Sequence, residues 1–230
     1  MKKSLVNKVF NEVAENYDLM NDLMSFGLHR SWKKEFIEQI KKKNTKILDI
    51  GSGTGDIVSQ ILKRKEILNA NFKIFLSDPN YKMINEGKKK VINNNKLFWV
   101  SNYAENLPFK NNFFDLITMS FSLRNVHNLN KSLLEIKRVL KKNGQFLCLE
   151  FGKVENTHIN NIYKLYSNLI IPKVGGIVTK SKESYEYLIN SIKKIASQEL
   201  LIKILKKNGY KRITYKNLSF GIVAIYSSFK

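Results

Sequence analysis

An apolar run that ends in three alternating glycines, ILDIGSGTGD at residues 47–56, constrains the fold more than any other feature. The apolar residues are typical of a buried strand, and the following segment, 56–68, has a helical period. Strand, glycine loop and helix form the first half of a β–α–β unit. Because ligands of open α/β sheets bind beyond the carboxyl ends of the strands, the loop is expected to line a ligand site.

The same alternation of strand and helix patterns continues to residue 151. Strands are predicted at 46–51, 72–78, 97–102, 114–122 and 145–151, and helices at 56–68, 80–92 and 128–142, with Gly144 ending the last helix. Such alternation predicts an α/β fold with a mostly parallel sheet covered on both faces.

The two ends of the chain have different patterns. An amphipathic helix is expected at the N-terminus, then loop and short helix over 16–30 and a helix over 31–43. The tail predicts a helix ending at Gly209 and an antiparallel hairpin that turns near 217–219. We therefore expect one domain with four parts: an N-terminal helical lid (1–45), a ligand-binding core (46–152), a helical insertion over the substrate (153–196), and a C-terminal helix and hairpin (197–230).

The residues of the glycine loop discriminate between ligands. A phosphate-binding P-loop needs Lys and Ser or Thr after its last glycine, whereas Gly55 is followed by Asp56 and Ile57. A dinucleotide loop needs a third glycine where Asp56 stands, and this carboxylate would repel a pyrophosphate. With Asp49 on the other side of Gly51 and Gly53, the loop favours a cationic ligand, and S-adenosylmethionine carries an ammonium and a sulfonium.

Side chains at the ends of the next strands extend this hypothesis. Asp78 ends the second strand, where an acidic residue accepts hydrogen bonds from ribose hydroxyls; an Asx turn or helix cap is the alternative. Ser120, near the end of the fourth strand, could contact the cofactor or be an ordinary strand-end hydroxyl. Arg124 and Asn125 follow, and could orient a substrate oxygen, stabilise a phenolate, or brace the loop.

Composition narrows the class of protein. The only cysteine, Cys148, permits no intrachain disulfide or cysteine-based metal cluster and suits a reducing cytoplasm. No apolar stretch approaches the ~20 residues that cross a bilayer, and the first residues do not resemble a secretory signal. The formal net charge of +21 favours anionic surfaces, including membrane headgroups, but does not by itself select a nucleic acid.

Four segments outside the glycine loop resemble the ubiquinone/menaquinone biosynthesis C-methyltransferases, a family of class I S-adenosylmethionine-dependent methyltransferases. These segments are VFNEVAENYDLMNDLMSFGLHRSWKK, AENLPFKNNFFDLITMSFSLRNV, SYEYLINSI and NLSFGIVAIYSSFK. The resemblance implies a Rossmann-like sheet, and methyl transfer to a ring carbon of a polyprenylated benzoquinol or naphthoquinol.

Cofactor contacts follow from the resemblance residue by residue. They fall on Thr54, Asp78, Tyr103 with Ala104, and Ser120. The family usually has Asp or Asn before the Ala-Glu pair, to meet the adenine amino group, whereas this chain has Tyr103 there. Either Asn102 substitutes through a shifted backbone, or the main chain alone meets the adenine.

The chemistry requires alignment of the two reactants, removal of a phenolic proton and exclusion of water, with no metal. His127 could be the base or a surface loop residue, and His29 is the other titratable candidate near the substrate. Tyr17 could close over the cofactor or simply pack. The expected partners are the quinol, an anionic membrane surface on the cytoplasmic side, and a second copy or a quinone-biosynthesis assembly.

Two other functions stay open at this point. A nucleic-acid methyltransferase would suit the charge, but the chain lacks an Asn/Asp-Pro-Pro-aromatic motif, and Cys148 lies inside a predicted strand, where a buried thiol is inert. The second alternative is a non-catalytic S-adenosylmethionine-binding subunit of a quinone-biosynthesis assembly, which only the unusual Tyr103 favours.

Overall fold

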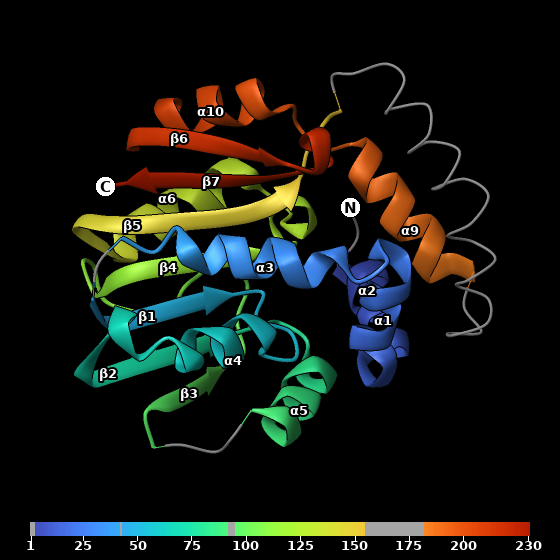
Figure 1. Ribbon diagram of the computed structural model, residues 1–230, viewed down its shortest axis with the longest axis horizontal. Coiled ribbons are helices and arrows are strands. Elements are labelled where there is room, and N and C mark those ends of the chain that lie inside the picture. The colour runs from blue at the N-terminus through green and yellow to red at the C-terminus, as the bar shows by residue number, and fades with distance from the viewer. Residues whose placement is uncertain (1–2, 42, 92–94, 155–181) are drawn as a thin grey trace.

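The computed structural model describes residues 3–41, 43–91, 95–154 and 182–230, and within them the strands form one mixed sheet. Its order is β3-β2-β1-β4-β5-β7-β6, with β7 antiparallel to both neighbours and the other pairings parallel. The strands are β1 (Asn44–Ile50), β2 (Leu68–Ser77), β3 (Leu97–Val100), β4 (Phe114–Ser120), β5 (Leu140–Phe151), β6 (Lys211–Leu218) and β7 (Val223–Phe229). The predicted α/β fold with an antiparallel C-terminal hairpin is confirmed (Figure 1).

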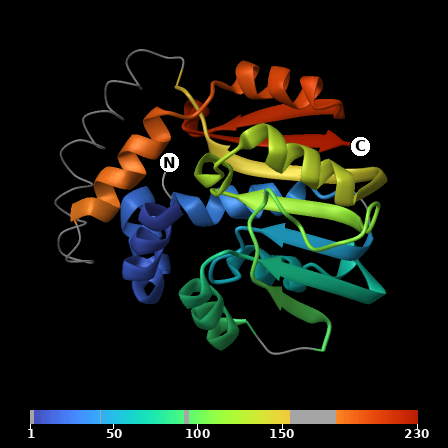
Figure 2. The same cartoon turned by 180° about the vertical axis from the view of Figure 1, so that it is seen from behind.

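Helices cover both faces of this sheet (Figures 1 and 2). They are α1 (Lys3–Val13), α2 (Tyr17–Ser25), α3 (Leu28–Glu38), α4 (Asp56–Lys63), α5 (Tyr81–Lys90), α6 (Leu129–Val139), α9 (Lys182–Lys193) and α10 (Gln198–Lys207), with short 3₁₀ turns η1 (Ala14–Asn16), η2 (Lys65–Ile67), η3 (Leu123–Asn125) and η5 (Ser219–Gly221).

Strand alternation divides the core into two layers. In β1, Leu48 packs with α6 and α10, whereas its neighbour Ile47 packs with α3 and α4. Both side chains have no exposed area. Since successive strand residues point to opposite faces, a continuous apolar run gives a sheet that is buried on both sides.

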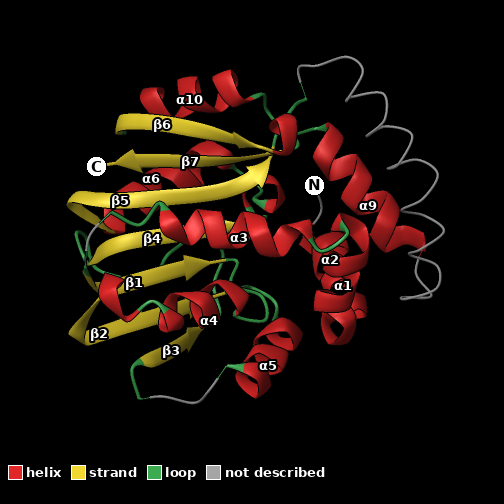
Figure 3. Ribbon diagram, viewed as in Figure 1, coloured by secondary structure: helices red, strands yellow, loops and turns green. Residues whose placement is uncertain are grey.

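The N-terminal helices α1 and α2, together with α9, lie beyond the carboxyl ends of the parallel strands (Figure 3). Helix α9 contacts both α1 and η3. Helices α1, α2 and α9 therefore lie at the edge of the sheet where the glycine loop follows β1. Most of the predicted insertion, residues 155–181, lies outside the described residues.

The N-terminal segment is more helical than its sequence predicts. The expected loop and short helix over 16–30 form the nine-residue helix α2, and α3 begins already at Leu28. Helix α3 ends at Glu38 and not at residue 43, because the Gln145 side chain binds the chain beyond it: its amide group donates to the Gln39 carbonyl at 2.9 Å and accepts from the Lys41 amide at 3.2 Å.

The predictions for two other boundaries were wrong. Helix α4 ends at Lys63, and β2 begins at Leu68, whereas the sequence predicted helix through residue 68. Helix α6 ends at Val139, not at Gly144, because Leu140 takes an extended conformation and pairs with Phe114. Gly144 is needed for close packing instead, since a Cβ there would lie 2.8 Å from the Leu140 side chain.

Candidate functional site

The glycine loop is held against the end of β2. Its Gly51 and Ser52 amides donate to the Ser77 carbonyl at 2.7 and 3.1 Å. Gly51 has a φ of +64°, and a Cβ there would lie 2.5 Å from the Ser122 side chain. Only glycine meets both constraints. The loop therefore passes close to the segment after β4, as ligand-binding loops of this kind do.

A pocket lies beyond this loop, and we call it the glycine-loop pocket. Helix α1 lines one side of it, and the ends of β1, β2, β3 and β4 line the other. Of the sequence-predicted site residues, it brings together Tyr17, Gly51, Gly53, Asp78, Asn102, Tyr103, Ala104, Ser120, Asn125 and His127. Asp49, Thr54, Arg124 and His29 are not among its lining residues.

Asp78 is the buried acid of this pocket. Its two carboxylate oxygens accept hydrogen bonds from the amides of Gly53 at 2.9 Å and Asn80 at 2.8 Å. Burial raises the pKa of Asp78 to about 6, although these amides favour the ionised form. The carboxylate is thus positioned by the glycine loop, and each oxygen keeps a second lone pair for a ligand hydroxyl. Asn80, not Asp78, caps helix α5 by accepting from the Met83 amide.

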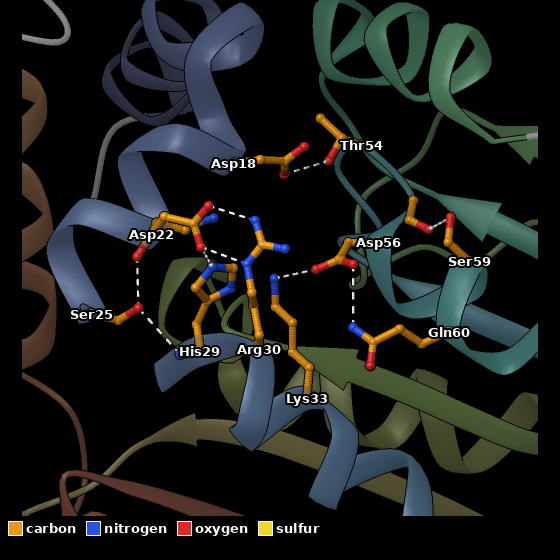
Figure 4. Close-up of polar contacts among 12 residues, drawn as sticks. Asp18, Asp22, Ser25, His29, Arg30, Lys33, Thr54, Asp56, Ser59 and Gln60 are labelled. Carbon is orange, nitrogen blue, oxygen red and sulfur yellow. Dashed lines mark hydrogen bonds and ion pairs between the residues drawn. The ribbon is translucent and has the colours of Figure 1, made fainter. Parts of the chain in front are cut away.

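The two acids beside the glycine loop do not line the pocket. Asp56 is turned away from the pocket, where Lys33 donates to it at 2.5 Å (Figure 4). Burial alone would raise the pKa of Asp56, but the charge and hydrogen bond of Lys33 outweigh it and hold the pKa below its ordinary value. Asp49 lies beneath the loop, and burial raises its pKa to about 7. The acids that line the pocket are Asp78 and Glu105.

Three buried oxygen atoms at or near this pocket lack a hydrogen-bond partner among the described residues, and one of them is Oγ of Ser52 in the glycine loop. The other two are Oδ2 of Asp49 and Oγ of Ser120. Buried polar atoms are usually satisfied, so these oxygens fit a site that receives a polar ligand. Together with the close glycine turn and Asp78, they fit a ligand that has hydroxyl and ammonium donors.

The end of β3 shows how Tyr103 is accommodated. The side-chain oxygen of Asn102 accepts from the Ser77 hydroxyl at 3.0 Å, and its side-chain nitrogen donates to the Tyr103 backbone carbonyl at 3.2 Å. The Tyr103 hydroxyl accepts from Asn7 of α1 at 3.4 Å. Asn102 is therefore held within its own loop, whereas Tyr103 joins the N-terminal helix to the pocket wall.

Thr54 is placed in a different contact. It is 3% exposed, and its hydroxyl donates to Asp18 of α2 at 3.4 Å (Figure 4). Asp18 also pairs with Lys90 of α5 at 2.7 Å. Thr54 thus connects the glycine loop to the N-terminal helices.

A second pocket, which we call the apolar pocket, adjoins the first. Phe10, Tyr17 and Phe121 line both pockets. Its other lining residues are Val9, Val13, Met20, Asn21, Met24, Ser25, His29, Trp32, Lys33, Arg124, Phe151, Tyr187, Ile192 and Ile222. An apolar chamber beside one that carries the carboxylates of Asp78 and Glu105 can hold an apolar substrate against a co-substrate with polar groups.

Arg124 lines the apolar pocket within a buried ion pair. Its Nη1 donates to Glu150 at 2.8 Å, and the two side chains are 6% and 0% exposed. It also donates from Nε to the Ser191 hydroxyl at 3.3 Å and from Nη1 to the Phe121 carbonyl. The loop-bracing network considered from sequence is therefore present, and it holds the guanidinium at the pocket wall.

Asn125 is bound by a residue that the sequence did not single out. The Tyr187 hydroxyl of α9 donates to its side-chain oxygen at 2.7 Å. Asn125 lines the glycine-loop pocket and Tyr187 lines the apolar pocket, so this bond lies where the two meet. Only the aromatic content of the segment hinted at a role for Tyr187, because its partner is 62 positions away.

The two candidate histidines occupy different pockets. His127 lines the glycine-loop pocket, its backbone amide donates to Glu105 at 2.6 Å, and its ring lies 5.8 Å from that of Tyr103. His29 lines the apolar pocket and pairs with Asp22 at 2.8 Å (Figure 4). In the described ranges, no three His, Cys, Asp or Glu side chains gather as metal ligands would.

Stability should depend on pH through Asp49. Because its pKa is raised from 3.8 to about 7, the folded state takes up a proton between these values, and the free energy of unfolding falls as pH rises through this window. Asp49→Asn removes that loss. We expect it to stabilise the ligand-free protein at pH 8 by roughly 1–3 kcal/mol, and much less at pH 4, in thermal unfolding.

The control is Asp115→Asn, which is expected to change the stability at pH 8 in the opposite direction. Burial alone would raise the pKa of Asp115, but hydrogen bonds from Lys141 and from the Lys46 and Thr45 amides hold it below its ordinary value. That carboxylate stabilises the fold above its unfolded pKa, so its removal should lower Tm at pH 8. An Asp49→Asn gain of equal size at both pH values would contradict the buried-acid explanation.

Comparison with solved structures identifies the fold. A possible histamine N-methyltransferase from Thermotoga maritima, described as SAM-dependent, superposes with a TM-score of 0.67 over 97% of this chain and 98% of that one, at 18% identity. Phosphoethanolamine N-methyltransferase 2 of Haemonchus contortus, solved with S-adenosyl-L-methionine, has a TM-score of 0.61 over 83% of this chain and 49% of that one, at 15% identity. The fold is that of class I S-adenosylmethionine-dependent methyltransferases.

Sequence comparison then gives the family. The model of the ubiE/COQ5 methyltransferase family matches residues 1–230. Proteins of Rickettsia bellii (strain OSU 85-389) and Rickettsia prowazekii, both named ubiquinone/menaquinone biosynthesis C-methyltransferase UbiE, are 49% and 48% identical over 233 residues, spanning all of this chain and 94% of each relative. The chain belongs to the ubiE/COQ5 methyltransferase family, and it is an S-adenosylmethionine-dependent methyltransferase.

Proposed function

We propose that this protein transfers the methyl group of S-adenosylmethionine to a ring carbon of a polyprenylated quinol in ubiquinone or menaquinone biosynthesis. Full-length relatives carry the name of that activity. The observation that supports it best is the pair of adjoining pockets, one with the carboxylates of Asp78 and Glu105 at the glycine loop and one apolar beneath the N-terminal helices. Bound S-adenosylmethionine supplies a methyl group on an electrophilic sulfonium.

The glycine-loop pocket would hold the methyl donor. Asp78 would accept from the ribose hydroxyls, the Tyr103–Ala104 backbone would meet the adenine, and Ser120 would lie near the methionine part. Asp49 would act from beneath the loop. Helix α1 and Tyr17 line this pocket, so the N-terminal segment would act as a lid that excludes water.

The apolar pocket would hold the quinol ring and the first units of its tail. Arg124 and Asn125 would orient a ring oxygen, because both lie where the pockets meet and both are fixed by buried partners. A cation near that oxygen would also stabilise a developing phenolate.

The direct test is methyl transfer to a short-tailed quinol lacking the ring methyl. Purified protein with labelled S-adenosylmethionine should put label on a ring carbon, as located by fragmentation mass spectrometry. A benzoquinol and a naphthoquinol should be assayed side by side, to separate the two branches. Label on nucleic acid but on neither quinol would support the nucleic-acid alternative instead.

The substrate's tail suggests that the enzyme works at a membrane surface. Leu19 and Phe26 of the α2 region are 51% and 72% exposed, and they flank Met20 and Met24 of the apolar pocket. No helix among the described residues is long and apolar enough to span a bilayer. With the net charge of +21, this exposed surface would rest on the anionic cytoplasmic leaflet.

Vesicle flotation checks this binding. The protein should float with anionic vesicles at low salt, and Leu19→Gln with Phe26→Gln should reduce the floated fraction several-fold because apolar contact is lost. The matched control is Leu134→Gln on α6, a leucine exposed to a similar 55%. Equal flotation of all three proteins would contradict the α2 surface as the point of contact.

A further inference from the structure

A histidine–carboxylate pair lies at the wall of the apolar pocket. His29 of α3 is 6% exposed, and its Nε2 lies 2.8 Å from Oδ1 of Asp22 in α2 (Figure 4). Arg30 binds the same carboxylate at 2.6 Å, which keeps it ionised. An ionised carboxylate only accepts hydrogen bonds, so it fixes the tautomer in which Nε2 carries the hydrogen and Nδ1 presents a lone pair.

The other ring nitrogen has no partner. Nδ1 of His29 is buried and makes no hydrogen bond among the described residues. An unsatisfied buried acceptor costs stability, typically about 1–3 kcal/mol, and a ligand hydroxyl that donates to Nδ1 would offset this cost. His29 lines the same pocket as Arg124 and Phe121, which lie at its border with the glycine-loop pocket.

The charged groups around His29 keep it neutral. Burial and the nearby Lys33 ammonium lower its pKa below the ordinary 6.5, against the opposing effects of Asp22 and Asp56. Lys33 itself is bound to Asp56 of α4, and Arg124 faces the pocket from η3. At neutral pH the imidazole is therefore a hydrogen-bond and proton acceptor.

Tyr187 of α9 is another ionisable side chain of the apolar pocket. Its hydroxyl donates to Asn125, and burial raises its pKa above the ordinary value. The Tyr187 hydroxyl is thus a donor, whereas Nδ1 of His29 is an acceptor.

We propose that His29 is the catalytic base for this chain, taking the ring-hydroxyl proton of the quinol through Nδ1, with Asp22 as the residue that positions it. The inference rests on the proposed function. It assigns to Asp22 and His29 a role separate from that of Arg124 and Asn125, which orient the ring oxygen.

The hydroxyl proton moves to Nδ1, and the ring carbon beside the resulting oxyanion forms a bond to the methyl carbon. The bond between methyl and sulfur breaks, and its electron pair stays on sulfur, giving a thioether. The methylated ring carbon then loses its hydrogen to water as a proton, while the imidazolium returns one to the ring oxygen.

The test compares His29→Gln with Lys34→Gln, an exposed position of the same helix. His29→Gln should lower kcat at least about 100-fold, the usual contribution of a general base, while S-adenosylmethionine binding measured by calorimetry stays within threefold. Lys34→Gln should change neither. In wild type, kcat should rise with pH through the pKa of His29, and His29→Gln should lose this limb.

A second variant separates a base from a packing residue. Asp22→Asn removes the bond that raises the pKa of His29, so the acid limb of kcat should move to lower pH while the plateau falls. A purely structural role would lower the plateau without moving the limb. Nitrogen NMR on wild type needs no variant: it should show hydrogen on Nε2 and none on Nδ1.

Several outcomes would overturn the proposal. These are a His29→Gln enzyme within threefold of wild type, an unmoved acid limb in Asp22→Asn, hydrogen on Nδ1, or loss of the limb in His127→Gln but not in His29→Gln. If wild type itself methylates no quinol, the proposed function fails instead, so the two failures are distinguishable.

Discussion

Asp78→Ala is expected to weaken S-adenosylmethionine binding at least about 100-fold, with the fold intact. The carboxylate lines the glycine-loop pocket and is held by the Gly53 and Asn80 amides, so its position is set before ligand binds. A site that loses a buried charged acceptor of two ligand hydroxyls forfeits about 1.5–3 kcal/mol per hydrogen bond. Isothermal calorimetry with S-adenosylhomocysteine and S-adenosylmethionine measures the loss.

Asp115→Ala is the matched control, because this carboxylate also accepts two backbone amides but lies outside both pockets. It should lower Tm without changing the dissociation constant. If Asp78→Ala bound the donor as tightly as wild type, Asp78 would be a turn-forming residue, the alternative that its sequence position left open.

Arg124→Met is expected to destabilise the protein by about 3–5 kcal/mol, because Glu150 would be left as an unpaired charge with no exposed area. For a domain of this size that corresponds to a fall in Tm of about 10 °C. Thermal unfolding of the ligand-free protein checks it. An unchanged Tm would contradict the buried ion pair.

The double variant Arg124→Met with Glu150→Gln separates bracing from catalysis. Removing both charges should recover most of the stability, since no buried charge is left uncompensated. We expect methyl transfer by the double variant to stay about 100-fold slower than in wild type, because the cation near the substrate oxygen is still missing. Full recovery of activity would mean that Arg124 only braces the loop.

The sheet could be predicted from the sequence because the patterns that indicate strands are local. The apolar run before Gly51 and the acid at the end of β2 follow from strand periodicity and from the rule that ligands meet the carboxyl ends of parallel strands. Asp78 was therefore placed correctly in the pocket lining.

Side-chain direction was harder to predict, because partners come from distant segments. Asp56 follows the glycine loop directly, yet Lys33 of α3 draws its carboxylate away from the pocket. Asp22 and Tyr187 were missed for the same reason. Each acquires its role through a partner on another element, His29 or Asn125, and no local pattern records that contact.

The most direct measurement is calorimetric titration of the purified protein with S-adenosylmethionine, NAD and ATP in parallel. We predict saturable binding of S-adenosylmethionine at one site per chain, abolished by Asp78→Ala, and no binding of NAD or ATP. If well-folded protein bound NAD or ATP but did not bind S-adenosylmethionine, the result would contradict the assignment of the glycine-loop pocket.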